Sequence, residues 1–209
     1  MWTREVKRFI RSKSRIVGSL GQPILFLVAL GYGLGPVFQK AGQGNYLEFI
    51  APGIIGMSII FTAIFNGRAE VRAIARIHGR RANIFSVTDR KIEPVHNHGS
   101  FFSGGVPVFS KRDLISTHRL GEEVTAALGK KPAILLRGNG QVTVGRTIPE
   151  AVMMAIYLEE AADMLYGALQ IGSPIPLTSE ESARRKEEAL PPVDLERAWN
   201  FFKQKTEKK

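Results

Sequence analysis

Two histidines one residue apart, His96 and His98, are the clearest candidates for metal chemistry in this sequence. In an extended segment, side chains two positions apart lie on one face, so both imidazole rings could reach the same ion. Neutral imidazole binds zinc well, and a site with three protein ligands keeps a fourth position open for a substrate oxygen. Substrate-contacting or hydrogen-bonded loop histidines are the alternative interpretation of this pair.

Arginine side chains offer a second kind of chemistry, because a guanidinium group suits carboxylates and phosphates. Arg137 and Arg146 lie close in sequence to Asn139, and these three are the candidate substrate-binding residues. Ordinary surface arginines are the alternative interpretation. No catalytic group is assigned, because nothing in the pattern gives the nearest acids, Glu70 and Glu93, the role of a base.

Composition limits the possible classes of protein. The chain has 209 residues, of which 44% are hydrophobic and 23% are charged, and it contains no cysteine. These values exclude a disordered chain and a protein that is hydrophobic along its whole length. The lack of cysteine excludes a disulfide scaffold, a thiolate metal site and a cysteine nucleophile.

The elements that position the candidate residues follow from periodicity and turn chemistry. Gly138-Asn139-Gly140 predicts a turn, because glycine and asparagine accept positive φ angles. Strands are predicted on either side of it, over 133–137 and 141–145. The other expected strands lie over 71–77 and 106–109. One helix is expected over 120–128, and further helices are expected to begin at 149, 179 and 194. Ser179 and Asp194 are the expected caps of the last two helices.

The net charge of +10 is unevenly distributed along the chain. It divides into +5 over residues 1–20, zero over 21–67, +5 over 68–91 and zero over 92–209. All of the excess positive charge therefore flanks one apolar block. No motif of interleaved aromatic and basic residues accompanies it, so a nucleic-acid partner is not expected.

The apolar block contains two uncharged runs, over residues 20–38 and 49–65. Each approaches the length of a membrane span, which is about 17–25 residues. With positive charge on both outer sides, the pattern predicts a two-helix transmembrane hairpin with cytoplasmic ends. It places the chain in the inner (cytoplasmic) membrane with lipid as a partner and the C-terminal domain in the cytoplasm. Two buried helices of a soluble, cytoplasmic domain are the alternative.

The first third of the chain has motifs of its own. The basic stretch Arg4 to Arg15 leads into Gln22-Pro23-Ile24-Leu25-Phe26, and Tyr46-Leu47-Glu48-Phe49-Ile50-Ala51-Pro52-Gly53 follows. Residues 1–67 resemble the start of a type 2 ATP-binding-cassette (ABC) permease. Such permeases have about six spans, whereas this chain offers two, so transport by this chain alone is not expected.

Residues 69–209 carry a different ordered set of motifs. The stretches are Ile74 to His78, Pro94-Val95-His96-Asn97-His98-Gly99-Ser100, Gly104-Gly105-Val106-Pro107-Val108-Phe109, Ile134 to Gly145 and Glu159-Glu160-Ala161-Ala162. They resemble the class II aldolase/adducin family. The resemblance implies an α/β fold, a three-layer α/β/α sandwich around a mainly antiparallel sheet, and usually a homotetramer. The family includes sugar-phosphate aldolases, decarboxylases of aromatic acids and non-catalytic adducin heads.

The resemblance also implies a divalent cation, usually zinc, held by three histidines. Two of them belong to a His-x-His motif, where this chain has Arg76-Ile77-His78, and the third belongs to the turn position held by Asn139. His78 remains, and together with His96 and His98 it forms the predicted metal-binding set. The family's catalytic carboxylate and phosphate loop lie upstream of this strand, where this chain has the permease-like segment.

The sequence therefore predicts two parts: a permease-like basic helix and hairpin over 1–67, and a class II aldolase/adducin-like domain over 68–209 that is incomplete at its N-terminal side. The predicted function is that of a lyase, cleaving an aldol or decarboxylating a small anionic or sugar-derived substrate. Catalysis is expected to be impaired because Arg76 and Asn139 replace ligands. A permease fragment and a fused reading frame without evolved activity are the alternatives.

Overall fold

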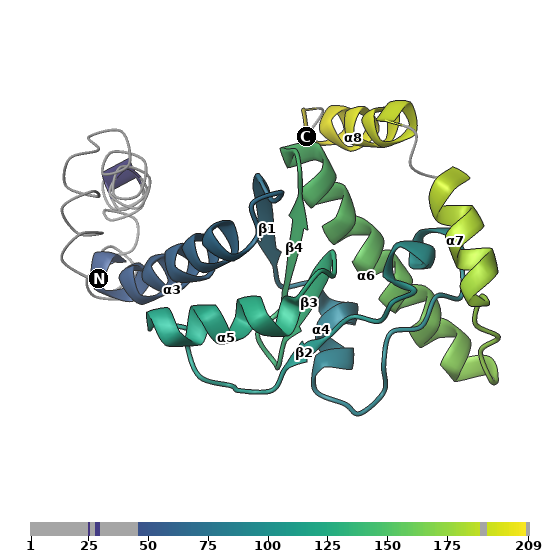
Figure 1. Ribbon diagram of the computed structural model, residues 1–209, viewed down its shortest axis with the longest axis horizontal. Helices are drawn as coiled ribbons and strands as arrows, with labels where there is room; N and C mark the ends of the chain where they lie inside the picture. The colour runs from purple at the N-terminus through teal and green to yellow at the C-terminus, as the bar shows by residue number, and fades with distance from the viewer. Residues whose placement is uncertain (1–24, 26–27, 30–45, 189–191, 208–209) are drawn as a thin grey trace. The chain divides into compact units, whose positions relative to one another are not determined.

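The computed structural model describes Leu25, Val28, Ala29 and residues 46–188 and 192–207 (Figure 1). The predicted basic N-terminal helix, and the first predicted span apart from those three residues, lie outside the described residues. The elements are α3 (Tyr46–Gly67), β1 (Ala73–Ile77), α4 (Arg80–Ser86), η1 (Asn97–Phe102), β2 (Val108–Phe109), α5 (His118–Leu128), β3 (Ala133–Leu136), β4 (Gln141–Gly145), α6 (Ile148–Ile171), α7 (Ser179–Glu188) and α8 (Pro192–Glu207).

The chain divides into two compact units. In its described residues, the first unit contains Leu25, Val28, Ala29, α3 up to Ala63 and the segment 114–122. Glycines allow close packing inside it, because a Cβ on Gly56 would lie 3.0 Å from the carbonyl oxygen of Ile115. A Cβ on Gly121 would likewise lie 3.0 Å from side-chain carbons of Ile59 and Ala63. The start of α5 therefore packs directly on α3.

Helix α3 coincides with the second predicted span. Among the described residues, its segment Ile50–Gly67 is the one helix long and apolar enough to cross a membrane. It also packs on residues of the aldolase-like part within the first unit, as a helix of a soluble protein does. The two-helix hairpin and its location in a membrane stay predictions, because the first run lies outside the described residues.

The second unit contains a four-stranded mixed sheet with the order β1-β4-β3-β2. Strand β4 pairs antiparallel with both β1 and β3, and β2 pairs parallel with β3. The hairpin predicted around Gly138-Asn139-Gly140 is confirmed, with β3 and β4 as its arms. An α/β class with a mainly antiparallel sheet is also confirmed, whereas the three-layer arrangement stays a prediction.

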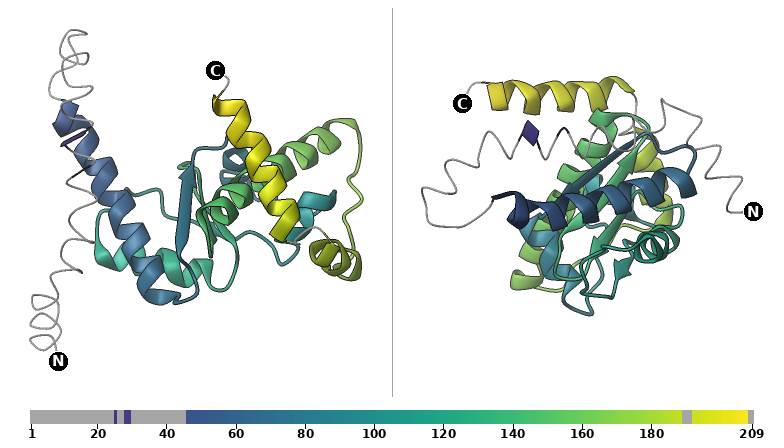
Figure 2. Two further views of the ribbon diagram at one scale, coloured as in Figure 1. Left: turned by 90° about the horizontal axis from the view of Figure 1, so that it is seen from above. Right: turned by 90° about the vertical axis from the view of Figure 1, so that its left-hand side faces the viewer.

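The long helix α6 packs against β4, β1 and β3, and α8 packs on α6 (Figures 1 and 2). The start of α6 is fixed by Thr147, whose hydroxyl accepts a hydrogen bond from the backbone N–H of Glu150 at 3.2 Å. The core between α6, the sheet and the loop before β2 is apolar and buried. Its largest members include Phe85, Phe101, Phe102, Met153, Leu158 and Leu165.

Two predicted helix caps differ from the structure. Thr178 rather than Ser179 caps α7, since its hydroxyl accepts from the N–H of Glu181 at 3.1 Å. The Glu181 carboxylate accepts in return from the N–H of Thr178 at 2.8 Å, which completes a capping box. Asp194 lies inside the first turn of α8 rather than before it. Both helices exist as predicted, and α7 begins one residue and α8 three residues earlier than the predicted caps imply.

Candidate active site

Three side chains meet at the end of β1, where this strand lies beside the turn that joins β3 to β4. Arg76 is on β1, His78 follows the strand, and Asn139 is in the turn. The Oδ1 atom of Asn139 lies 3.1 Å from Nη2 of Arg76 and 3.1 Å from Nε2 of His78. The antiparallel register, which pairs Ile77 with Gln141, brings the three together. Arg76, His78 and Asn139 are called the corner cluster below.

Gly140 allows the turn to approach the strand this closely. Its φ angle is +83°, in a region that residues with a side chain rarely adopt. A Cβ at this position would lie 2.3 Å from the carbonyl oxygen of Ile77 and 3.1 Å from the Cα of His78. Glycine is therefore required for the turn to close onto the end of β1.

Helix α4 holds the same turn from outside. The Asn83 side chain accepts a hydrogen bond from the N–H of Gly140 at 3.0 Å. The Ser86 hydroxyl accepts from the N–H of Gly138 at 2.9 Å, and Ser86 is fully buried. The turn that carries Asn139 is thus bonded to a helix as well as to a strand, and this fixes its position.

The first turn of α4 is in turn fixed by Glu159 of α6. Its two carboxylate oxygens accept hydrogen bonds from the N–H groups of Arg81 at 2.7 Å and Ala82 at 3.0 Å. A short helix has unpaired N–H groups at its start, and a carboxylate satisfies them well. Glu159 therefore has a structural role and connects α6 to the corner cluster through α4.

The hydrogen bonds of the corner cluster define its protonation. Arginine only donates, so the oxygen of the Asn139 amide must face Arg76, and the same oxygen then accepts from His78. His78 accordingly carries its proton on Nε2. Arg76 is half-buried, burial lowers its pKa, and its Nε has no hydrogen-bond partner among the described residues. A partly desolvated guanidinium with an unused donor is suited to an anionic oxygen.

The corner cluster does not fit the three-histidine zinc site that the resemblance implies. Arg76 places a cation where a ligand is expected, and Asn139 contributes an amide oxygen that is already engaged by two donors. The Nε2 atom of His78 faces this oxygen as a donor, so its lone pair is not free there. One histidine beside a guanidinium cannot offer the ligand number that zinc requires.

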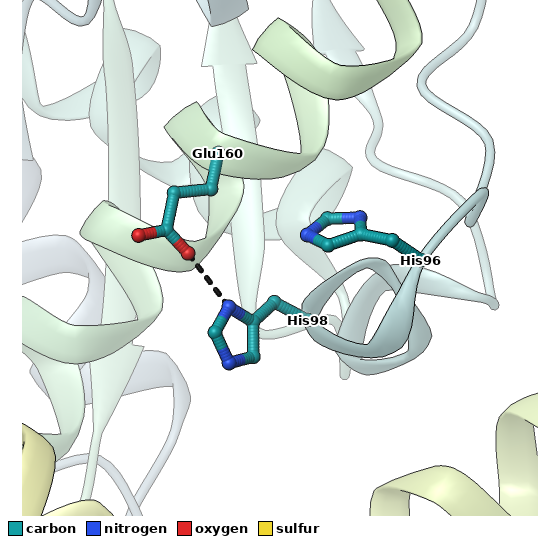
Figure 3. A group of neighbouring side chains, drawn as sticks. All are labelled: His96, His98 and Glu160. Carbon is teal, nitrogen blue, oxygen red and sulfur yellow. Dashed lines mark hydrogen bonds and ion pairs between the residues drawn. The ribbon is translucent and has the colours of Figure 1, made fainter.

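A second cluster lies where η1 meets α6. His96 has an extended backbone before η1, His98 lies within η1, and Glu160 is on α6. The Nδ1 atom of His98 is 2.6 Å from a carboxylate oxygen of Glu160. One ligand atom from each of the three residues lies within 4.8 Å of the others, as Figure 3 illustrates. These residues are called the His–His–Glu cluster below.

Aromatic packing supports this cluster from one side. The His98 ring stacks on Tyr157 with centroids 4.1 Å apart and planes at 27°, and Tyr157 stacks on Phe101 at 5.5 Å. Burial is the main cause that lowers the pKa of His96 and raises the pKa of Tyr157. The Nδ1 atom of His96 is buried and has no partner among the described residues. His96 is therefore a neutral imidazole with a free nitrogen.

The predicted extended geometry of His96 and His98 is wrong for His98, which belongs to a 3₁₀ helix. The two rings nevertheless lie close together, with centroids 5.7 Å apart and planes at 72°. Of the predicted metal set, the structure joins His96 and His98 in one cluster and holds His78 in the other. Sequence reasoning gave Glu160 no site role, because its proximity to His98 depends on packing between segments 62 residues apart.

The predicted substrate-binding residues do not form one group. Asn139 precedes the start of β4, whereas Arg146 follows its end and is exposed. Five residues of strand separate them, which corresponds to roughly 14–17 Å at about 3.4 Å per residue. Arg146 lines a cavity of about 250 Å³ together with Arg68, Glu70, Lys130 and Lys186. Arg137 is half-buried just before Asn139, and its Nε lacks a partner among the described residues.

The two acids considered as possible bases, Glu70 and Glu93, have no hydrogen bond or ion pair with the corner cluster among the described residues. Glu70 forms an exposed ion pair with Arg68 at 2.8 Å. Hydrogen bonding, first to its own backbone and then to Arg68, lowers the pKa of Glu70. Glu93 is exposed. Neither residue contacts the corner cluster, so no general base is assigned among the described acids.

The mixed sheet covered by one long helix is a fold that this chain shares with solved proteins of the aldolase II type. Residues 56–166, more than half of the chain, match the family described as class II aldolase and adducin N-terminal domain. The chain belongs to this family. The match begins inside α3, and the permease-like segment and the boundary near residue 67 stay predictions.

Similar proteins include two enzymes and one solved structure. The chain is 30% identical over 117 residues to a 3,4-dihydroxyphthalate decarboxylase of Terrabacter sp. strain DBF63, covering 53% of this chain and 47% of that one. It is 26% identical over 117 residues to a 5-methylthioribulose-1-phosphate/5-deoxyribulose-1-phosphate aldolase of Rhodospirillum rubrum, covering 56% and 53%. An aldolase II superfamily protein from Pseudomonas syringae shares the fold, with a TM-score of 0.64, 24% identity and coverage of 73% and 62%.

The chain spans about half the length of the curated relatives that it matches. These relatives are a decarboxylase and an aldolase, and both kinds of enzyme break carbon–carbon bonds. The comparisons therefore support a lyase-type domain, and the reaction of this chain is treated as a proposal below.

Proposed function

We propose that this chain is a carbon–carbon lyase that acts on a small anionic substrate at the corner cluster. One observation carries the proposal. Arg76 is a half-buried guanidinium whose side chain is bonded, among the described residues, to the amide of Asn139 and to no carboxylate. Desolvating a cation without a counter-charge is unfavourable, so such a group is stabilised when an anion binds to it.

The chemistry of both candidate reactions suits this arrangement. In an aldol cleavage the electron pair of the broken carbon–carbon bond is delocalised onto the neighbouring carbonyl oxygen, which becomes an enolate oxygen. In the decarboxylation of a phenolic acid the ring carbon that carries the carboxylate is protonated first, and the pair of the broken bond then returns to the ring as carbon dioxide leaves, with negative charge on the phenolic oxygen. The guanidinium of Arg76 stabilises this oxygen where the charge develops, which is the kind of interaction that lowers a barrier.

His78 is the proposed proton donor. Its Nε2–H and the guanidinium of Arg76 both donate to the Oδ1 atom of Asn139, which places the two donors close together. The His78 side chain is exposed to solvent. In its imidazolium form His78 passes this proton to carbon and becomes neutral imidazole: to the ring carbon before carbon dioxide leaves in a decarboxylation, and to the enolate carbon after the bond breaks in an aldol cleavage. In an aldol cleavage the proton of the substrate hydroxyl group passes to water as the aldehyde forms. The departing group is carbon dioxide in a decarboxylation and an aldehyde in an aldol cleavage. The neutral His78 imidazole then takes up a proton from solvent, which restores the donor.

Decarboxylation is the reaction that we favour. The Terrabacter relative, at 30% identity, is a decarboxylase of an aromatic dicarboxylic acid. A guanidinium also matches a planar carboxylate or phenolate better than it matches a neutral sugar hydroxyl. Aldol cleavage of a sugar phosphate is the second candidate, supported by the Rhodospirillum rubrum relative.

The family implies a divalent cation, zinc in the usual case, that would polarise a substrate oxygen. The corner cluster is not suited to hold it, for the reasons given above. In this proposal the fixed charge of Arg76 supplies part of that electrostatic role. Turnover is expected to be lower than in enzymes with an intact metal site, because one guanidinium carries less charge than a divalent ion.

Assembly and location complete the proposal. Family resemblance supports a homo-oligomer, with a tetramer as the expected form. Helix α3, as the one candidate span among the described residues, is consistent with attachment to a lipid membrane, and the positive charge of residues 68–91 favours the cytoplasm for the sheet-bearing unit. Release of the chain by alkaline carbonate washing of membranes, without detergent, would count against the membrane part of this proposal.

The test is a substrate panel with the full purified chain. It is incubated with 3,4-dihydroxyphthalate and, separately, with 5-deoxyribulose 1-phosphate, and carbon dioxide, dihydroxybenzoate and aldehyde are measured. We expect decarboxylation, with kcat reduced about 100- to 10,000-fold in His78→Gln because the proton donor is lost. The exposed histidine variant His118→Gln is the matched control and should retain activity. The proposal would be refuted if neither decarboxylation nor aldol cleavage were detected, or if His78→Gln kept full activity.

A further inference from the structure

We propose that His96, His98 and Glu160 bind one divalent cation of the zinc type, at a position other than the corner cluster. The three residues offer two imidazole nitrogens and one carboxylate oxygen, all within 4.8 Å of one another. Two nitrogens and one oxygen are a common ligand set for zinc, and they leave a fourth position for water or a substrate oxygen.

The geometry requires only small movements. Zinc–ligand distances of about 2.0–2.2 Å place neighbouring ligand atoms roughly 3.3–3.5 Å apart in a tetrahedral site. The His98 and Glu160 atoms are now 2.6 Å apart in a hydrogen bond, so they separate by less than about 1 Å when the ion replaces the shared proton. The longer separations, at most 4.8 Å, close by up to about 1.5 Å to reach the same spacing.

The orientation of the His96 ring supplies the second observation. The ring lies edge-on to His98 and extends toward α6, where Glu160 is located (Figure 3). The nitrogen on the Glu160 side is Nε2, at the tip of the ring, so this atom is the one that would bind a cation held between the three residues.

The supporting structure holds the ligands in place before an ion binds. His98 is stacked on Tyr157, which lies one turn before Glu160 on the same side of α6. The 3₁₀ helix that carries His98 is closed by a hydrogen bond from Gly99 N–H to His96 O at 3.0 Å. Such support is what distinguishes a built site from exposed histidines that happen to be close.

Metal binding at this cluster does not depend on the proposed lyase activity, because it is measured without substrate. The whole chain has four histidines, and each is placed by the structure. A four-variant scan therefore covers every imidazole: His96→Gln and His98→Gln test the cluster, while His78→Gln and His118→Gln are matched controls. Glu160→Gln removes the charged ligand while keeping the shape of the side chain.

The experiment uses the full chain, purified in detergent with its affinity tag removed. Zinc binding is followed by equilibrium dialysis with elemental analysis, and cobalt binding by the visible absorption of a tetrahedral site. We expect one ion per chain. Loss of any one of His96, His98 or Glu160 should weaken binding at least 10- to 100-fold, whereas the two control variants should bind as the wild type does. Circular dichroism identifies any variant that fails to fold, and for such a position His→Asn or Glu→Asp replaces the first variant.

Two results would overturn the inference. One is the absence of stoichiometric zinc and cobalt binding at micromolar concentration. The other is loss of binding in His78→Gln with binding retained in His96→Gln and His98→Gln, which would locate the ion in the corner cluster. Failure of the lyase assay with intact metal binding would refute only the proposed function, so the two proposals fail separately.

Discussion

Replacing Gly140 by alanine tests the geometry of the corner cluster most sharply. Gly140 has a φ angle of +83°, and a Cβ there would lie 2.3 Å from the carbonyl oxygen of Ile77. Adopting a left-handed backbone costs a residue with a side chain about 1–2 kcal/mol. The contacting atom belongs to the backbone and cannot rotate away, so the clash adds about 1–3 kcal/mol.

A small opposing effect reduces the total, because alanine narrows the unfolded ensemble by about 0.4–1 kcal/mol relative to glycine. The expected net loss in the free energy of unfolding is therefore about 3 kcal/mol. For a chain of this size it corresponds to a fall in Tm of roughly 6–12 °C. Since Asn139 precedes Gly140 directly, the turn should also move away from His78.

The assay is urea denaturation followed by circular dichroism, with stability taken from the midpoint at constant slope. Gly167→Ala is the matched control, because Gly167 is exposed within α6 and a Cβ there meets nothing within 4 Å. It should stabilise the protein by about 0.5–1 kcal/mol through helix propensity. A Gly140→Ala midpoint equal to that of the wild type would refute the close approach of the turn to β1.

Three further predictions follow from the same structure. Tyr157→Leu removes the ring contacts with His98 and Phe101 and should lower the free energy of unfolding by roughly 1–3 kcal/mol in the same denaturation assay. Tyr157→Phe keeps both ring contacts, and its free energy of unfolding should stay within about 0.5 kcal/mol of the wild-type value. Hydrogen bonding from Thr178 lowers the pKa of Glu181, so the stabilisation of α7 by the ionised Glu181 is present above pH 4.5 and is lost as the pH falls through the lowered pKa of the folded state. Hydrogen exchange of the Thr178 amide, followed by NMR, should then become faster at low pH. Glu181→Gln should remove that pH dependence. The double substitution Arg76→His and Asn139→His restores three imidazoles in the corner cluster and should add a second bound zinc ion in dialysis, and unchanged stoichiometry would contradict the geometry given for that cluster.

The local sequence was sufficient to predict the hairpin and the strand that carry the corner cluster. Glycine and asparagine at 138–140 favour only a tight turn, and the flanking residues are apolar enough for buried strands. The long helix α6 was predicted for a similar reason, since a proline and an acid mark its start. These signals are encoded within a few neighbouring residues.

Helix α4 and the 3₁₀ helix η1 were not predicted, because distant residues stabilise them. Helix α4 has only seven residues, and its first N–H groups are satisfied by Glu159 from α6. The η1 segment contains Gly99 and serine, which gave no helical period. Contacts between residues far apart in the chain decide such elements, and local propensity is then a weak guide.

The candidate sites show the same division. The sequence singled out His96 and His98 by spacing alone, although the reason given, an extended segment, holds only for His96. It grouped His78 with them, whereas the structure bonds His78 to Asn139. Glu160 had no local signal at all, because an acid on a helix acquires a ligand role only when packing brings it to other ligands.

The most direct test of the proposed function compares the rate of carbon dioxide release from 3,4-dihydroxyphthalate in the wild type, Arg76→Gln and Arg76→Lys. Loss of the guanidinium should lower kcat about 100- to 1,000-fold, as loss of one oxyanion-stabilising donor does, and lysine should recover part of the rate. Arg112→Gln, at an exposed arginine, is the matched control and should be unchanged. Wild-type turnover that persists in Arg76→Gln would contradict the role assigned to Arg76.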